Sequence, residues 1–305
     1  MNASILPIVD VEADTHFRSV AKSLNLDPDD PWIGSYAEFV WRRGRRVFET
    51  LPGGVAGRPI LEFGCNYGAT SITLARLGAS VVAVDVSETY IALARANAAR
   101  YGVSGSIAFF HATDTTRLPF DDASFEVITC CSVLEYVPPE MLAAVQRELD
   151  RVLRPGGLVV VTGTSNRIWP REVHSRRWCA NYIPRALDKW LWSPPRERGV
   201  NPWRIRYGFG SAYENLDLTD HGRAYLDAKE HGGDDRMKCG MLRFANRVLS
   251  SVRMTVGLAT PSISVRLRKP TSDLPSPREA PSKRMTRTQE ITPFRWTRVD
   301  RFRHG

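Results

Sequence analysis

The sequence predicts an α/β protein organised around a parallel sheet, because strand and helix patterns alternate along its first half. Residues 60–70, ILEFGCNYGAT, read as a strand, a glycine loop and the start of a helix. Residues 80–86, SVVAVDV, form an almost continuous apolar run, which is typical of a parallel strand covered on both faces. The chain of 305 residues is long enough for one such domain with additions to it.

Local patterns predict the remaining elements in order. Residues 36–51 carry apolar side chains at helical spacing and end at the helix breaker Pro52-Gly53-Gly54. Further helices are expected at 88–101, 138–153 and 237–252, and further strands at 106–111, 125–130, 158–162 and 262–269. Residues 1–31 show little periodicity and are expected to hold at most one short helix.

Composition narrows the class of protein. The hydrophobic content of 43% fits a globular chain, and no apolar run approaches the roughly 20 residues of a membrane-spanning helix. Residues 1–10 lack the basic start and long apolar segment of a leader, so we expect a soluble, cytoplasmic protein without an integral membrane segment. The five cysteines are odd in number and lack a C-x-x-C spacing, so they indicate neither a disulfide framework nor a metal site.

The net charge of +9 is concentrated in the C-terminal quarter of the chain. Residues 236–305 hold 16 Lys and Arg against four acids. Residues 271–305 are rich in Pro, Ser, Thr and Arg without periodicity, so we expect a basic disordered tail. Such a tail permits weak contact with an anionic membrane or with nucleic acid, and the alternative, which we favour, is a tail that is only solvated.

The loop between Gly64 and Gly68 is the first candidate site. Its backbone N–H groups and the positive end of the following helix suit a ligand that carries a carboxylate or a phosphate. The dinucleotide fingerprint G-x-G-x-x-G would need glycines at 64, 66 and 69, where the chain has Gly64, Asn66 and Ala69. NAD therefore fits poorly, and a different nucleotide cofactor is indicated.

Asp85 ends the second predicted strand, 21 residues after Gly64. A carboxylate at this place can accept hydrogen bonds from both hydroxyls of an adenosine ribose. The alternative is a helix cap, but Ser87 can supply that cap without Asp85. We therefore expect Asp85 to bind a ribose.

Four stretches in the correct order resemble the class I S-adenosylmethionine-dependent methyltransferases of the small-molecule type. The pattern E-x-G-x-x-x-G from Glu62 to Gly68 is similar to motif I of that family, and Asp85 follows at the expected strand end. The LPF at 118–120, with an acid four residues earlier, and RELDRVLRPGGLVVVTG at 147–163 are similar to later parts of its core. The resemblance implies a Rossmann-like, doubly wound, mostly parallel seven-stranded sheet and S-adenosyl-L-methionine as cofactor.

The resemblance also implies which residues hold the cofactor: Glu62, Gly64, Cys65, Asn66, Gly68, Asp85, Val86, Asp114, Thr115 and Cys131. The Asp114 carboxylate and the Thr115 amide would meet the adenine, with an Asx turn made by Asp114 as the alternative. Cys131 would line the cofactor, and a redox role is not indicated because no basic residue nearby in sequence activates its thiol. Tyr136 stands where many relatives carry His, so no general base is carried over from that position.

Residues 166–235 follow the fifth strand and are interpreted as a cap inserted there, where substrate choice would reside. The cap is dense in tryptophan, which forms either a small core or an aromatic wall for a ring or sugar. His174 is the candidate catalytic base, because imidazole titrates near neutrality, and the alternative is a histidine that holds this loop to the core. Four arginines near it would bind an anionic group or are solvated: Arg167, Arg171, Arg176 and Arg177.

These patterns predict five parts of the chain: an N-terminal extension (1–33), the cofactor-binding core (34–165), the cap (166–235), the C-terminal part of the core sheet (236–270) and the tail (271–305). The expected function is methylation by in-line displacement, at a hydroxyl or carboxyl oxygen of a small molecule, a lipid-linked intermediate or a glycan. Two alternatives remain, a non-catalytic scaffold that binds the cofactor and an RNA methyltransferase. The sequence indicates neither the acceptor nor the oligomeric state.

Overall fold

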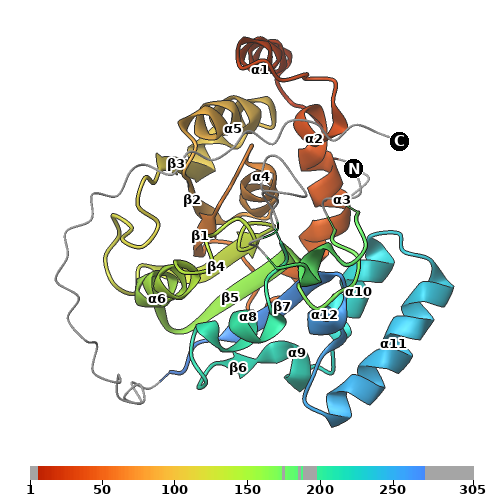
Figure 1. Cartoon of the computed structure of the whole chain (residues 1–305). Coiled ribbons are helices and arrows are strands. Elements are labelled where there is room, and N and C mark those ends of the chain that lie inside the picture. The colour runs from red at the N-terminus through yellow and green to blue at the C-terminus, as the bar shows by residue number, and fades with distance from the viewer. Residues whose placement is uncertain (1–5, 174–175, 185–186, 188–197, 272–305) are drawn as a thin grey trace.

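A computed structural model describes residues 6–173, 176–184, 187 and 198–271. Their centre is a seven-stranded sheet with the order β3-β2-β1-β4-β5-β7-β6 (Figure 1). Strands β1 to β5 are parallel, and β7 is antiparallel to both of its neighbours. The strands are β1 (Pro59–Phe63), β2 (Ser80–Asp85), β3 (Ile107–His111), β4 (Phe125–Cys131), β5 (Leu153–Ser165), β6 (Glu214–Asn215) and β7 (Ser262–Arg268). The predicted α/β class and mostly parallel sheet are confirmed.

Helices cover both faces of this sheet. One apolar cluster joins α3, α4 and α5 to the face that carries Ile60 and Val81, and another joins α6 and α8 to the face that carries Leu61 and Ile128. Successive side chains of a strand point to opposite faces, so a strand covered on both faces is apolar at nearly every position. The helices are α1 (Val11–Ser23), α2 (Pro31–Gly34), α3 (Tyr36–Glu49), α4 (Ala69–Arg76), α5 (Glu88–Arg100), α6 (Leu142–Val152), α8 (Pro202–Gly208), α9 (Leu216–Thr219), α10 (Arg223–His231), α11 (Arg236–Ser251) and α12 (Val256–Ala259).

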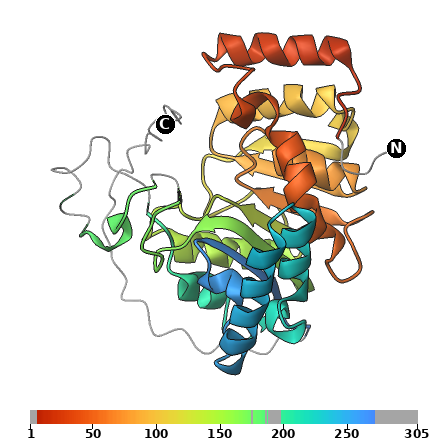
Figure 2. The ribbon, with the colours of Figure 1, turned by 90° about the vertical axis from the view of Figure 1, so that its right-hand side faces the viewer.

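The N-terminal segment is more ordered than the sequence predicts. Within residues 1–31 it contains α1, which at 13 residues is longer than the short helix expected, and the four-residue α2 begins only at Pro31. Asp10 caps α1 by accepting a hydrogen bond from the amide of Ala13 at 2.9 Å. Phe17 and Ala21 are buried in a cluster with Leu93 of α5, across which α1 lies (Figure 2). Two buried positions in 13 residues are too weak a periodic signal to reveal the helix from sequence.

Several later elements also depart from their predicted bounds. The sequence patterns locate six of the seven strands and miss β6, which has only two residues. β6 pairs with β7, although its residues fall in the stretch interpreted as the cap. Helix α6 begins at Leu142 rather than at residue 138, and β5 extends from Leu153 to Ser165. The division of the chain into five parts stays a prediction.

Some predicted features lie outside the described residues. These are His174 and residues 272–305 of the basic tail, together with two of the cap's tryptophans at 190 and 192. Within the described ranges, none of the helices is both long and apolar enough to cross a membrane.

Candidate active site

The parallel register brings the predicted site residues to one edge of the sheet. Phe63 of β1 pairs with Val84 of β2, and Asp85 pairs with His111 of β3. The segments that follow β1, β2, β3 and β4 therefore leave the sheet at the same edge. The strand order reverses between β1 and β4, and ligands of open α/β sheets bind outside the carboxyl ends of the strands at such a reversal.

The glycine loop takes a backbone that few residues adopt. Gly64, Asn66 and Gly68 have φ values of 76°, 49° and 79°. Glycine adopts positive φ freely, and asparagine is among the few other residues that visit this region. Asparagine at position 66 is therefore compatible with the positive φ of this turn. A Cβ on Gly64 would lie 2.1 Å from Cγ2 of Val133, so the protein itself already fills the space beside this glycine.

Asp85 links the glycine loop to the end of β2. Its Oδ2 accepts a hydrogen bond from the amide of Asn66 at 2.9 Å, and its Oδ1 accepts one from the amide of Ser87 at 2.9 Å. Ser87 Oγ caps α5 by accepting from the amide of Tyr90 at 3.3 Å, as expected. Burial raises the pKa of Asp85, and the bonds from the Ser87 and Asn66 amides oppose that rise. A carboxylate has about four acceptor positions, so Asp85 keeps acceptor capacity for a ribose hydroxyl beyond its amide bonds.

Glu62 lies beneath the loop and is buried. Its carboxyl accepts a hydrogen bond from the hydroxyl of Ser71, in the first turn of α4. Burial raises the pKa of Glu62 to about 8, against the opposing effect of hydrogen bonds from Ser71 and Thr70. Glu62 therefore ties β1 to α4 and is mostly protonated at neutral pH in this structure.

The two predicted cysteines are buried or half-buried thiols. The amide of Cys65 donates to the carbonyl of Val84 at 3.0 Å, and the Cys65 side chain packs in the core. The hydroxyl of Thr162 contacts Cys131 Sγ at 3.2 Å. Burial, with the nearby carboxyl of Glu62, raises the pKa of Cys131 to about 12, so its thiol stays neutral. These surroundings are those of packing residues.

In the loop after β3, Asp114 forms the Asx turn that is the alternative to an adenine contact. Asp114 Oδ1 accepts hydrogen bonds from the amide of Thr116 at 2.8 Å and from its hydroxyl at 2.6 Å. These bonds lower the pKa of Asp114, which is exposed, and Thr115 beside it is half-buried. Val86, the next predicted residue along this edge, contacts the ring of His111 through its carbonyl, with 3.0 Å between Nε2 and O. The proposed adenine contact of Asp114 and Thr115 stays a prediction.

The start of α3 adds residues that the sequence does not reveal as part of the site. Burial raises the pKa of Tyr36 to about 12, and the nearby ionisable groups of Cys131, Glu62 and Glu135 act in the same direction. Tyr36 packs against the apolar cluster that contains Ile60 of β1, and Cys131 at the end of β4 packs against the same cluster. Its ring lies 5.2 Å from that of Trp32 and 5.7 Å from that of Phe39, and both of these rings are partly exposed. We call Trp32, Tyr36 and Phe39 the aromatic cluster.

Two buried carboxyls, those of Glu135 and Glu172, lie at the carboxyl end of β5. Glu135 Oε1 accepts a hydrogen bond from the amide of Ser165 at 3.2 Å, and Glu172 Oε1 accepts one from the hydroxyl of Ser165 at 3.0 Å. Both carboxyls are buried, so the end of β5 joins the segment after β4 to the segment that precedes His174. The sequence shows neither carboxyl as a site residue, because only the fold brings them to Ser165.

Three of the four predicted arginines of the cap lie in a segment that folds back on itself through the pairing of Arg171 with Trp178. Arg171 Nε donates to the carbonyl of Arg176 at 3.0 Å, and the side chains of Arg171, Arg176 and Arg177 are exposed. Arg167 is half-buried and has a partner within the described chain. Arg177 likewise has a partner within the described chain, and the binding of an anion by these arginines stays a prediction.

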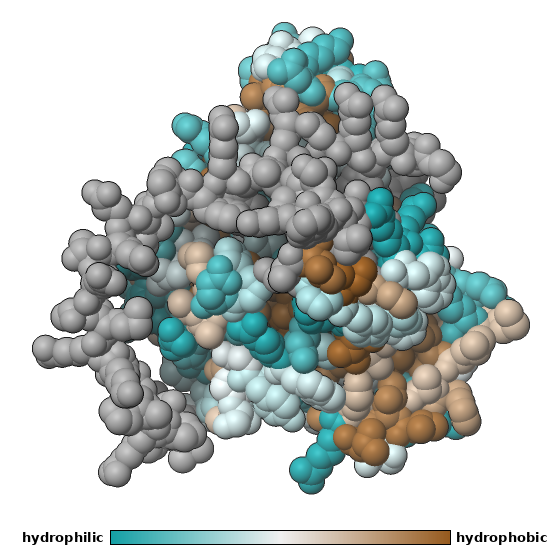
Figure 3. Space-filling model, viewed as in Figure 1, coloured by the Kyte–Doolittle hydropathy of each residue, from teal (hydrophilic) through white to brown (hydrophobic). Residues whose placement is uncertain are grey.

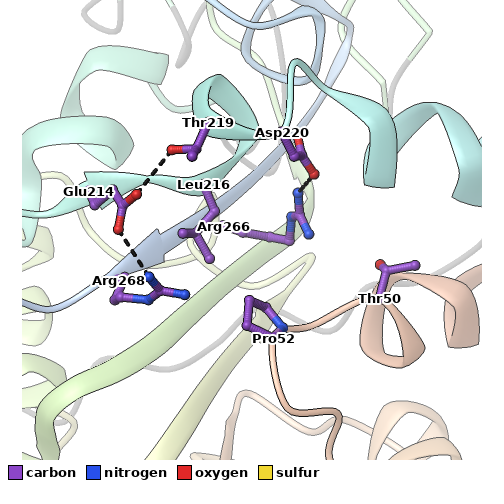
Figure 4. A pocket seen from close by; sticks show the side chains of 8 residues that line it. All are labelled: Thr50, Pro52, Glu214, Leu216, Thr219, Asp220, Arg266 and Arg268. Atoms are coloured by element: carbon purple, nitrogen blue, oxygen red, sulfur yellow. Dashed lines mark hydrogen bonds and ion pairs between the residues drawn. The ribbon is translucent and has the colours of Figure 1, made fainter.

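A pocket of about 260 Å³ lies elsewhere, between β6, β7 and the segment that follows α3 (Figure 4). Arg268 in its wall pairs with Leu158, in the amino-terminal half of β5, so the pocket is away from the carboxyl edge. Arg266 forms an ion pair with Asp217 at 2.7 Å, and Arg268 forms one with Glu214 at 3.3 Å. The charges of this pocket are therefore already matched.

The comparisons with known proteins agree with this architecture. Residues 60–157 match a family model described as a methyltransferase domain. A ubiquinone biosynthesis O-methyltransferase from Sodalis glossinidius is 30% identical over 188 residues, which are 55% of this chain and 72% of that protein. A demethylmenaquinone methyltransferase from Clavibacter sepedonicus is 32% identical over 185 residues, 54% of this chain and 70% of that protein. A solved S-adenosylmethionine-dependent methyltransferase from Mesorhizobium loti is 20% identical, with a TM-score of 0.47, and the match covers 76% of this chain and 98% of that one.

The sheet and its carboxyl edge define a Rossmann-like protein that binds a nucleotide cofactor. With relatives of this identity and coverage, the chain belongs to the class I S-adenosylmethionine-dependent methyltransferases. Its cofactor is S-adenosyl-L-methionine. The residues present fit that cofactor, because Gly64 and Gly68 hold the loop at positive φ and the Asp85 carboxylate at the end of β2 keeps acceptor capacity beyond its amide bonds.

Proposed function

We propose that the protein transfers a methyl group to a hydroxyl oxygen on the ring of a small molecule. The aromatic cluster supports a ring-bearing acceptor, because partly exposed Trp32 and Phe39 flank Tyr36, which packs against the same apolar cluster as the predicted cofactor residues Cys65 and Cys131. Aromatic side chains bind flat rings over a large apolar area. The relative named as a ubiquinone biosynthesis O-methyltransferase supports oxygen as the acceptor atom.

Bound S-adenosyl-L-methionine supplies an electrophilic methyl group. The chain's own residues then have three tasks: to hold the cofactor, to place the acceptor oxygen in line behind the methyl carbon, and to exclude water. We assign the first task to the glycine loop and Asp85. We assign the second and third to the aromatic cluster, whose Tyr36 packs against the same apolar cluster as Cys131.

A hydroxyl acceptor must lose its proton, so a base near the acceptor would accelerate transfer. His174 remains our candidate, since it comes two residues after Glu172, whose carboxyl is fixed at the end of β5 by Ser165. Changing His174→Ala should lower turnover about a hundredfold to ten-thousandfold and spare cofactor affinity. The wild-type rate should also fall as pH drops through the imidazole pKa. Full turnover of the variant on the true acceptor would make His174 structural.

The proposal is tested with S-adenosylmethionine labelled in its methyl group. The purified protein is offered small phenols, aliphatic carboxylic acids and RNA in separate reactions, and we expect label in the phenols. Phe39→Ala should raise KM for the acceptor more than it lowers kcat, while Phe244→Ala, which changes an exposed phenylalanine on α11, should change neither. Label found only in the acids or only in RNA would contradict the proposal, as would equal effects of the two variants.

A further inference from the structure

An apolar stripe runs along the outer face of α11, away from the site. Five large side chains on this face are 57–73% exposed: Met237, Met241, Phe244, Val248 and Val252. They recur at intervals of three or four residues, so they lie one above the other on one side of the helix. Figure 3 shows the apolar surface that gathers over α11. Single exposed apolar residues are ordinary, but a continuous row marks an interaction surface.

The opposite face of α11 is fixed to the protein, so the stripe cannot turn inward. Asn246 Nδ2 donates to the carbonyl of His221 at 2.7 Å, and its Oδ1 accepts from the amide of Val256 at 3.0 Å. Leu242 and Leu249 pack against a cluster formed by α10 and α12. The helix therefore has two apolar faces, one packed and one that projects from the molecule.

Basic side chains border the stripe. At 100° per residue, Arg236, Arg243 and Arg247 fall along one side of it and Lys238 along the other. Glu230 pairs with Arg243 and Asp234 pairs with Lys238, whereas no ion pair joins Arg236 or Arg247 to another residue in the described part of the chain. The sequence has no acid at all between residues 236 and 271. The stripe is thus an apolar row in a positively charged setting.

We propose that the α11 stripe docks the protein on the surface of an anionic lipid bilayer, with the helix lying in the plane of the interface. An apolar helix face about 22 Å long can enter the boundary between headgroups and acyl chains. The arginine and lysine stems that border it reach outward to the lipid phosphates. A second copy of the chain fits less well, because symmetric pairing of two stripes would bring rows of like charge together. This docking does not depend on the identity of the methyl acceptor.

The test is flotation of the full-length protein with vesicles of phosphatidylcholine, with or without phosphatidylglycerol. We expect the protein to float with the anionic vesicles and to bind less at high salt. The double change Met241→Glu and Phe244→Glu should abolish binding, while Val11→Glu, at an equally exposed apolar position of α1, should not. Arg236→Gln with Arg247→Gln should weaken binding about fivefold per removed charge, and exposed Arg76→Gln on α4 should not change it.

Three outcomes would overturn the proposal. The first is that the wild type binds neither kind of vesicle. The second is that the stripe variants bind as well as the wild type, which would assign binding to the basic residues beyond 271. The third is that the wild type is a dimer that Met241→Glu converts into a monomer without any effect on vesicles, which would make a second copy the partner. Thermal unfolding of each variant confirms that these exposed changes leave the fold intact.

Discussion

Glu62 and Asp85 stand near the ends of neighbouring strands, yet their surroundings differ. Asp85 accepts hydrogen bonds from two backbone amides, whereas Glu62 is fully buried and accepts hydrogen bonds from hydroxyls of α4. The sequence predicts both acids at this edge, because each ends an apolar run before a turn. It does not predict the protonated state of Glu62, since that state depends on how closely α4 packs over β1. Tyr36 is missed for the same reason, because only the packing of α3 brings it to the site.

The raised pKa of Glu62 predicts a pH dependence of stability. A carboxyl with a folded pKa of about 8 stabilises the fold fully below its unfolded value of about 4.5 and loses that contribution as pH rises through 8. The free energy of unfolding of the wild type should therefore fall between about pH 5 and pH 9, by at most about 1.4 kcal/mol per pH unit.

Denaturant unfolding across this pH range checks the prediction. Glu62→Gln should show a flatter profile, because its amide stays neutral, and Glu88→Gln, at an exposed acid on α5, should follow the wild type. Parallel profiles for the wild type and Glu62→Gln would mean that Glu62 is ionised in the folded protein at neutral pH.

At the scale of elements, the segment after β4 packs so closely against the glycine loop that position 64 has no room for a side chain. Gly64→Ala should destabilise the fold by about 1 to 2 kcal/mol through its positive φ, and further through overlap with Val133. Shortening the neighbour by Val133→Ala should restore part of this loss. Unfolding free energies of the wild type, both single variants and the double variant measure the coupling, and strictly additive changes would show that the two residues do not compete for space.

The N-terminal helices depend on one buried arginine of α5. Arg100 forms an ion pair with Asp14 of α1 at 2.8 Å, donates to the carbonyl of Gly34 at 2.8 Å and stacks on the ring of Phe17. Arg100→Ala should reduce the free energy of unfolding by about 3 kcal/mol, because it leaves Asp14 and the Gly34 carbonyl without this partner. Arg18→Ala removes an exposed partner of the same Asp14 and should cost less than about 1 kcal/mol. Equal losses in chemical denaturation would contradict the role of Arg100.

At the scale of the whole molecule, the sheet is predictable because every central strand is covered on both faces and reads as an apolar run. The two-residue β6 leaves no such run, and its pairing with β7 depends on the course of the chain between β5 and β7. The α11 helix is predictable as a helix, but not its exposed stripe, because sequence periodicity does not show which apolar face is packed. Residues that act across the sheet edge are likewise visible only once the strands are aligned.

Calorimetric titration with S-adenosyl-L-methionine tests the central claim, that the carboxyl edge of β1 and β2 holds the cofactor. We predict one molecule bound per wild-type chain. Asp85→Ala should weaken binding by about 2 to 4 kcal/mol, as expected for two lost charge-assisted hydrogen bonds, whereas Asp121→Ala, at an exposed acid before β4, should bind as the wild type does. Unchanged affinity of a folded Asp85→Ala protein would contradict the account.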